Sequence, residues 1–252
     1  MIESNVILEI SKKNIIHNYK YFNKLKKNNI CAITIKSNAY GLGYENTYEL
    51  LLKNGCKHFF VATTKEAINI RKKFSKGCIY ILNGIEFNNL IIFEKYKLIP
   101  ILSNLNDYKK IKNSNIKYGI QLNTGINRLG VNYNDFKKIL TKDKNLKIII
   151  SHLASADEKN NPYNKIQLTK FIKIINMYKN SKKIFSLANS FGCILSKKYL
   201  FDMIRPGISI YGGHFNNITL KKNIKPVVKL KAKILQIKKL EKNQYVGYNQ
   251  TF

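Results

Sequence analysis

The feature that most constrains this chain is a regular alternation of short apolar runs with longer segments of helical spacing. Eight apolar runs recur, at residues 31–36, 58–63, 78–83, 98–103, 117–123, 146–152, 183–189 and 202–208. The segments between them, such as 44–54, 64–74 and 163–178, carry apolar residues at helical spacing and are long enough to connect parallel strands. Eight β-α units predict an α/β fold of the (β/α)8 TIM barrel type, whose usual size is about 250 residues. A doubly wound open sheet is the structural alternative.

The two ends of the chain depart from this alternation. A short strand, Val6 to Ile10, precedes a helical stretch over 11–27. After Pro226 the sequence alternates strictly between apolar and polar residues from Val228 to Ile237, which predicts a half-solvated antiparallel strand. We therefore expect an N-terminal strand (1–10) that packs on a C-terminal β-rich domain, a barrel (11–225) and the opening strands of that domain (226–252). Because two short strands do not make an independent domain, we expect a partner to complete the sheet or the chain to be truncated.

Composition narrows the class of protein. With 44% hydrophobic and 12% aromatic residues, the chain can bury enough apolar area to fold, which argues against disorder. No apolar run reaches about 18 residues, so we expect no membrane-spanning helix. The first residues lack the features of a signal peptide, which predicts a cytoplasmic location. Four widely separated cysteines, with no CxxC spacing, predict neither a metal site nor a disulfide framework.

The charge is strongly basic, at +31 from 45 Lys and Arg against 14 Asp and Glu. Such an excess suggests nucleic-acid binding. However, the basic residues are nearly all lysines, scattered along the chain among many Asn and Ile instead of gathered in one stripe. We interpret them as a compositional bias at solvent-facing positions and expect no specific nucleic-acid partner.

In a barrel, functional groups collect where strands give way to the loops that follow them. At the first such junction Lys36 closes an apolar strand, Tyr40 follows four residues later, and Gly41 and Gly43 permit a tight loop. An amine at the mouth of an apolar barrel suits covalent attachment to a carbonyl carbon, or work as a general base. On position alone, the alternative is a lysine that only extends from a strand end into solvent.

Later strand ends add further polar groups in the same order along the chain. They are Arg128 after the fifth strand, His152 after the sixth, Asn189 and Ser190 after the seventh, and Arg205, Gly207 and Ile208 after the eighth. An arginine suits a substrate carboxylate, and the last two loops of a barrel often hold a phosphate. Each fragment alone has a plain structural explanation, a core histidine or a turn. Together they indicate one site.

Six motifs carry a resemblance to a known family: IKSNAYGLG (35–43), LNTGINRLG (122–130), SHLASADE (151–158), ANSFG (188–192), RPGISIYG (205–212) and VGYNQTF (246–252). In this order they resemble the alanine racemases, fold-type III enzymes that use pyridoxal 5′-phosphate. The resemblance implies a (β/α)8 barrel followed by a β-rich domain.

The resemblance also implies roles for two bases. Lys36 would hold the cofactor covalently and then serve as one base. Tyr248 would be the second base, reaching the opposite face of the substrate from a neighbouring subunit. Inversion at Cα requires proton removal on one face and delivery on the other, and a tyrosine needs cationic or hydrogen-bonding neighbours to act as a base. His152 and Arg205 match the family residues in that supporting role.

The remaining matches concern cofactor and substrate binding. Tyr40, Ser190, Gly207 and Ile208 would hold the phosphate. Arg205 would also face the pyridine nitrogen and keep it unprotonated, and Arg128 would steady a cofactor oxygen and the substrate carboxylate.

Two positions depart from the family pattern. Gln121 stands where many members have a lysine that becomes carbamylated and orients the arginine, and Asn123 stands where an Asp follows. Gln121 can hydrogen-bond Arg128 but carries no charge, so we expect weaker positioning of Arg128.

The leading hypothesis is therefore an alanine racemase, which interconverts L- and D-alanine to supply D-alanine for peptidoglycan and forms a homodimer if the β-domain is completed. The family also includes members that act on serine or lysine. The alternative is a pyridoxal-phosphate-binding barrel that does not catalyse, either carrier-like or the product of a decaying gene.

Overall fold

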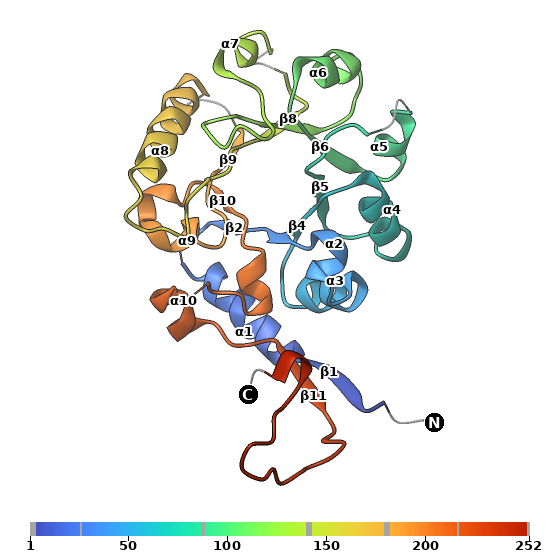
Figure 1. The fold of residues 1–252 in the computed structure, drawn as a ribbon. Coiled ribbons are helices and arrows are strands. Elements are labelled where there is room, and N and C mark those ends of the chain that lie inside the picture. Colours follow the sequence, from blue (N-terminus) through green and yellow to red (C-terminus); the bar gives the residue numbers. More distant parts are fainter. Residues whose placement is uncertain are drawn as a thin grey trace.

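A curled parallel sheet forms the centre of the molecule (Figure 1). The computed structural model describes residues 4–25, 27–86, 89–139, 143–178, 182–215 and 217–250. Seven strands follow one another in chain order around the sheet: β3 (Ile33–Thr34), β4 (His58–Val61), β5 (Cys78–Ile81), β6 (Leu98–Leu102), β7 (Tyr118–Gln121), β8 (Leu146–Ile150) and β9 (Ile184–Ser186). These strands lie within the apolar runs that the sequence predicts.

The ring is closed by the first and last barrel strands. A two-residue strand, β2 (Ile30–Cys31), leads directly into β3 and pairs in parallel with β10 (Met203–Ile204). The amide of Ala32 donates to the carbonyl of Ile204 at 2.9 Å, and the amide of Arg205 donates to the carbonyl of Ala188, just beyond β9, at 2.9 Å. Closure on both sides of β10 confirms the predicted (β/α)8 barrel, and the open-sheet alternative is wrong.

Helices surround the ring on its outside (Figure 1). The α-helices are α1 (Lys12–Asn23), α3 (Tyr44–Lys53), α4 (Thr64–Lys73), α5 (Ile91–Lys95), α6 (Leu105–Ile111), α7 (Tyr133–Phe136), α8 (Pro162–Ile175), α9 (Gly192–Leu195) and α10 (Ile218–Asn223). The segment labelled α2 (Lys36–Tyr40) is a left-handed turn after β3, because Ser37 to Tyr40 have positive φ. Single 3-10 turns are η1 (Asn176–Tyr178), η2 (Lys197–Tyr199), η3 (Ile208–Tyr211) and η4 (Tyr248–Gln250). Several helices start at a side-chain cap, as α1 does where Ser11 Oγ accepts from the Asn14 amide at 3.3 Å. The predicted helical segments at 44–54, 64–74 and 163–178 are confirmed as α3, α4 and α8. No helix of the described residues is both long and apolar enough to cross a bilayer.

The core has two parts because parallel barrel strands are buried on both faces. One part fills the barrel interior with Ala32, Phe60, Tyr80, Ile99, Ile101, Ile148, Ile150 and Met203. The other lies between strands and helices. Packing inside is tight at Gly119, where an added Cβ would lie 2.5 Å from Ile101 Cδ1 and 2.6 Å from Ile148 Cγ2. The packed barrel interior thus fixes the strands whose ends carry the predicted site residues.

A two-stranded ribbon projects from the barrel (Figure 1). It pairs β1 (Val6–Ile10) antiparallel with β11 (Val228–Ala232), and all residues of both strands are exposed. The predicted strand from Val228 to Ile237 is therefore too long, and it is exposed on both faces instead of half-solvated. Just beyond Ala232, the Lys233 amide donates to the Asn5 carbonyl at 2.9 Å. The domain division at 10/11 and 225/226 stays a prediction.

Candidate active site

A cavity of about 440 Å³ opens where the barrel strands end. Eight of the nine predicted site residues line it: Lys36, Tyr40, Arg128, His152, Ser190, Arg205, Gly207 and Ile208. They come from the first, fifth, sixth, seventh and eighth strand ends, as the barrel geometry requires. The fold thus gathers groups that are up to 172 positions apart in sequence into one site.

The cavity is positively charged. Three cationic side chains, Lys36, Arg128 and Arg205, line it, and its lining within the described residues includes no Asp or Glu. Burial, followed by the charges of Arg205, Arg128 and Lys36, lowers the pKa of His152 to about 3. His152 is therefore neutral at neutral pH and adds hydrogen-bonding capacity without charge. Such a cavity suits a ligand that carries more than one negative group.

Arg205 is a buried cation held by neutral groups. Its guanidinium donates to the Ser186 hydroxyl and to the Ser151 carbonyl, and its Cζ lies 5.8 Å from the centre of the Phe60 ring. None of the ion pairs among the described residues includes it. Burial lowers the pKa of Arg205 to about 10, so it stays charged at neutral pH. Its charge is left to act on whatever occupies the cavity.

A second group of contacts forms a cradle at the ends of the last two strands. The hydroxyl of Ser190 accepts from the amides of Gly207 at 3.0 Å and Ser209 at 3.4 Å. A Cβ on Gly207 would lie 2.5 Å from the Tyr40 hydroxyl oxygen, so only glycine leaves room for that hydroxyl. Burial raises the pKa of Tyr40, which keeps its hydroxyl protonated as a donor. The two amides hold the Ser190 oxygen in place, and the hydroxyls of Ser190 and Tyr40 are donors that suit a phosphate.

The Tyr40 ring is fixed from behind. It packs on Tyr211 with ring centres 5.0 Å apart, and the Tyr211 hydroxyl donates to the Thr34 carbonyl at 3.1 Å. Because Tyr211 and Thr34 are buried, the Tyr40 ring packs against a part of the barrel that is shielded from solvent.

The segment after Lys36 is a left-handed turn. Ser37, Asn38, Ala39 and Tyr40 have φ between 52° and 56°, and Gly41 ends the turn with φ of 88°. For residues other than glycine this conformation costs about 1–2 kcal/mol each. The sequence predicts only a tight loop at Gly41 and Gly43, because four non-glycine residues give no sign of a left-handed turn.

The loop that carries Arg128 is ordered from its first residues. Asn123 Oδ1 accepts from the amides of Gly125 at 3.0 Å and Asn127 at 3.2 Å. Gln121 donates to the carbonyl of Leu129 at 3.0 Å, and not to Arg128 as the sequence suggests. The side-chain amide of Gln121 therefore holds the backbone of the residue after Arg128. The Arg128 side chain itself is exposed.

Comparison with known proteins places these features in a family. The family of alanine racemase N-terminal domains matches residues 10–215. The chain is 36% identical to the alanine racemase of Rickettsia canadensis, over 97% of this chain and 70% of that protein. This chain belongs to the alanine racemase family. It is also 37% identical to the alanine racemase of Rickettsia bellii, over 90% of this chain and 58% of that protein.

Solved alanine racemases have the same fold. The enzyme from Bartonella henselae, with covalently bound pyridoxal phosphate, gives a TM-score of 0.86 at 28% identity over 99% of this chain and 72% of that one. The enzyme from Acinetobacter baumannii gives a TM-score of 0.89 at 24% identity, over 98% of this chain and 72% of that one, which shows the fold alone. The chain thus spans about 58–72% of the length of these four alanine racemases.

Tyr248 is the predicted site residue that this racemase-family chain does not bring to the cavity. It begins η4, in the segment after β11, and 97% of its side chain is exposed. It is not among the residues that line the cavity. Within one chain the two predicted bases are therefore apart.

Other lining residues were missed by sequence reasoning, among them Phe60 and Asn83. Asn83 is held by Glu86, whose Oε1 accepts from its amide nitrogen at 3.1 Å. Both lie at or just after strand ends, β4 and β5, so barrel geometry is the signal that could have found them. Neither belongs to the six racemase motifs.

Proposed function

We propose that this chain binds pyridoxal 5′-phosphate through Lys36 and interconverts L- and D-alanine, which supplies D-alanine for peptidoglycan. The observation that carries the proposal is a cavity that combines a lysine amine, a buried arginine with only neutral partners and a hydroxyl and amide cradle. The same family includes the Bartonella henselae enzyme with covalently bound pyridoxal phosphate.

The residues fit this cofactor. The phosphate would be held by Tyr40, Ser190 and the backbone at Gly207 and Ile208. Because Gly207 has no side chain, the Tyr40 hydroxyl can lie close to this backbone. Arg205 would face the pyridine nitrogen. A fixed cation there would keep that nitrogen unprotonated. The lining includes no Asp or Glu among the residues that the structure describes, which suits the cofactor's phosphate and the substrate's carboxylate together.

When bound, pyridoxal phosphate supplies a carbonyl that bonds to an amine and a ring that withdraws electrons from the substrate Cα. Lys36 would move the Cα proton on one face, and the Tyr248 hydroxyl on the other. Arg128 would bind the substrate carboxylate, with its loop held by Asn123. His152 would hydrogen-bond as a neutral group, since its pKa is about 3.

Two further parts complete the proposal. Because Tyr248 lies outside the cavity of its own chain, it would act in the cavity of a second copy, as part of a homodimer. The location would be the cytoplasm, where reducing conditions keep cysteines such as Cys31, Cys56, Cys78 and Cys193 in the free form seen here.

A second candidate function is cofactor binding without racemisation. The exposed position of Tyr248 favours it, because a chain that supplies only Lys36 has a base on only one face. Such a chain would hold pyridoxal phosphate and would not invert alanine.

Proton NMR in deuterated buffer separates the two candidates. The chain is incubated with pyridoxal phosphate and D- or L-alanine, with Lys36→Ala as control, and exchange at Cα is followed. Exchange from both enantiomers with inversion supports the racemase. Exchange from one enantiomer supports the one-base chain, and exchange no faster than in Lys36→Ala contradicts the proposed racemisation.

A further inference from the structure

We infer that Glu66 is a positioning residue for Lys36, because its carboxylate holds the left-handed turn that starts next to that lysine. The inference rests on the proposed role of Lys36. Glu66 lies in the first turn of α4, in the β-α unit that follows the one carrying Lys36.

The carboxylate of Glu66 joins two neighbouring strand ends. Its Oε1 accepts from the amide of Ser37 at 2.6 Å. Its Oε2 accepts from the amides of Ala62 at 2.7 Å and Thr63 at 3.3 Å. One side chain thus satisfies backbone donors after β3 and after β4, and both Lys36 and Ala62 line the cavity.

The turn needs support at both ends because its four left-handed residues are unfavourable. Its far end is held within the same segment, where Asn38 Oδ1 accepts from the amide of Tyr44 at 2.9 Å and the Asn38 carbonyl accepts from the amide of Gly43 at 2.9 Å. At the near end, beside Lys36, the acceptor for Ser37 comes from another β-α unit. Within the turn, the Ser37 carbonyl accepts from the amide of Gly41 at 2.9 Å and the Ile35 carbonyl accepts from the amide of Ala39 at 2.9 Å. Loss of the Glu66 contact would leave these bonds in place but would leave the Ser37 amide, next to Lys36, without its acceptor.

A glutamate meets this need better than its close relatives. A carboxylate has two acceptor oxygens, and its charge strengthens hydrogen bonds from backbone amides. Glutamine has one acceptor oxygen and would turn its own NH2 group toward an amide donor. Aspartate keeps the charge but is one methylene shorter, so it cannot reach both strand ends from the same backbone position.

Helix capping explains only part of the geometry. Thr63 and Glu66 form a reciprocal capping box, in which Thr63 Oγ1 accepts from the Glu66 amide at 3.1 Å. This common role accounts for Oε2 but not for the contact of Oε1 with Ser37. The substitution Thr63→Ala therefore weakens the cap while leaving that contact in place.

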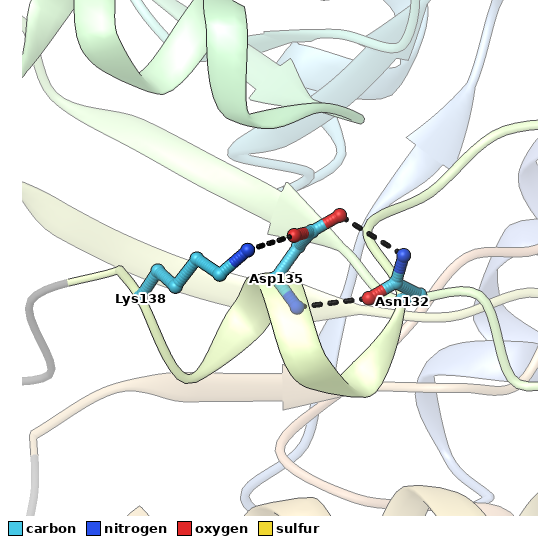
Figure 2. Close-up of polar contacts among 3 residues, drawn as sticks. All are labelled: Asn132, Asp135 and Lys138. Carbon is cyan, nitrogen blue, oxygen red and sulfur yellow. Dashed lines mark hydrogen bonds and ion pairs between the residues drawn. The ribbon is translucent and has the colours of Figure 1, made fainter.

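Asp135 provides a second control. It occupies the equivalent helix position in α7, and its carboxylate accepts from the Asn132 side-chain amide at 2.9 Å and from the Lys138 amine at 2.9 Å. Figure 2 shows these contacts. Asn132 Oδ1 in turn accepts from the Asp135 amide at 2.8 Å. These contacts stay within residues 132–138, so Asp135→Asn removes an acid from a helix start without touching the Lys36 turn.

The first measurement is hydrogen exchange of the Ser37 amide by NMR, without cofactor. In Glu66→Gln and Glu66→Asp we expect exchange to be faster by roughly tenfold, the effect of one lost charge-assisted hydrogen bond. In Thr63→Ala and Asp135→Asn we expect the wild-type rate. An unchanged Ser37 rate in Glu66→Gln, in a chain whose circular dichroism is that of wild type, overturns the inference.

The second measurement is covalent labelling of Lys36. Each chain is titrated with pyridoxal phosphate, reduced with borohydride, digested and analysed by mass spectrometry. We expect half-maximal labelling of Lys36 to need roughly tenfold more cofactor in both Glu66 variants and in neither control. Wild-type labelling in Glu66→Gln overturns the positioning role. A wild-type chain that leaves Lys36 unlabelled overturns the proposed function as well, and is recognised because the failure precedes any substitution at Glu66.

Discussion

The barrel strands and β1 of the β1–β11 ribbon are similarly apolar, as the sequences LIPIL of β6 and VILEI of β1 show, but they differ in what surrounds them. The barrel strands have a partner on each side and are buried, as β6 is along its whole length. The ribbon strands have one partner each, and every residue of β1 and β11 is exposed. Apolar character alone therefore does not bury a strand.

The same contrast divides the proposed chemistry. Lys36, Arg205 and Ser190 all lie at the closed barrel, where hydrogen bonds hold Arg205 and Ser190. Tyr248 stands beyond the ribbon and is 97% exposed. Of the two proposed bases, Lys36 therefore lines the cavity of its own chain and Tyr248 does not.

The prediction with the largest effect concerns the proposed second base, Tyr248. In Tyr248→Phe we expect inversion of alanine to fall roughly 10²- to 10⁴-fold, the usual contribution of a general acid-base group. Exchange from one enantiomer should continue through Lys36, and the unfolding temperature should not change. Proton NMR and thermal melting measure the two, with Tyr245→Phe, an exposed tyrosine of the same segment, as control. Wild-type inversion in Tyr248→Phe would contradict the two-base assignment.

The packing contrast is tested by truncating one apolar side chain in each region. Ile148 is fully buried in the barrel interior and Leu8 in the ribbon is 51% exposed. We expect Ile148→Ala to lower the free energy of unfolding by about 2–5 kcal/mol, and Leu8→Ala by less than about 0.5 kcal/mol. Denaturant titration measures both. Equal losses would mean that the ribbon is covered in solution, for example by a second copy.

The positive cavity predicts a pH dependence of stability. The pKa of His152 is about 3 in the folded chain against 6.5 ordinarily, so below pH 6.5 the unfolded chain binds a proton that the folded chain does not. The free energy of unfolding should therefore fall as pH drops from 6.5 toward 3, by about 1.4 kcal/mol per unit from this residue. His152→Asn should lose this part of the slope and match wild type in slope above pH 6.5. Urea titrations between pH 4.5 and 7.5 test it, and identical slopes below pH 6.5 would refute it.

The smallest expected effect concerns the loop of Arg128. Asn123→Ala removes the acceptor for the amides of Gly125 and Asn127, so Arg128 should be less well placed for a carboxylate. We expect the KM for alanine to rise by about five- to tenfold, with kcat nearly unchanged, since a hydrogen bond contributes about 1 kcal/mol. Asn123→Asp keeps both backbone contacts and should stay near wild type. A fall in kcat instead of a rise in KM would assign Asn123 to another role.

Sequence reasoning recovers the barrel because its signal is local. Each buried parallel strand is a short apolar run, and closure only requires eight of them in order. The end of β11 was not predictable in this way. The alternation continues to Ile237, whereas the strand ends at Ala232, which pairs with Val6, the first residue of β1. Partner length is a non-local property.

The site was predictable where motifs mark strand ends and hidden where tertiary contacts override local preference. Eight motif residues line one cavity. The left-handed turn at Ser37 to Tyr40, in contrast, could not be predicted, because none of these residues is a glycine. Glu66 looks like an ordinary capping residue, and its contact with Ser37 spans 29 positions. The partner of Gln121 also depended on loop geometry, which placed the carbonyl of Leu129 within reach.

The closure of the barrel through β2 and β10 sets an order of events during synthesis. Ile30 pairs with Met203, so the first barrel strand cannot gain its second neighbour until more than 170 further residues have been translated. At 5–20 residues per second this delay is on the order of ten seconds or more. Until then, any parallel sheet that forms on the nascent chain lacks the strand that pairs with β2. The cradle at Ser190 and Gly207 is completed only at the end of the same interval, because Gly207 follows Met203 in the chain.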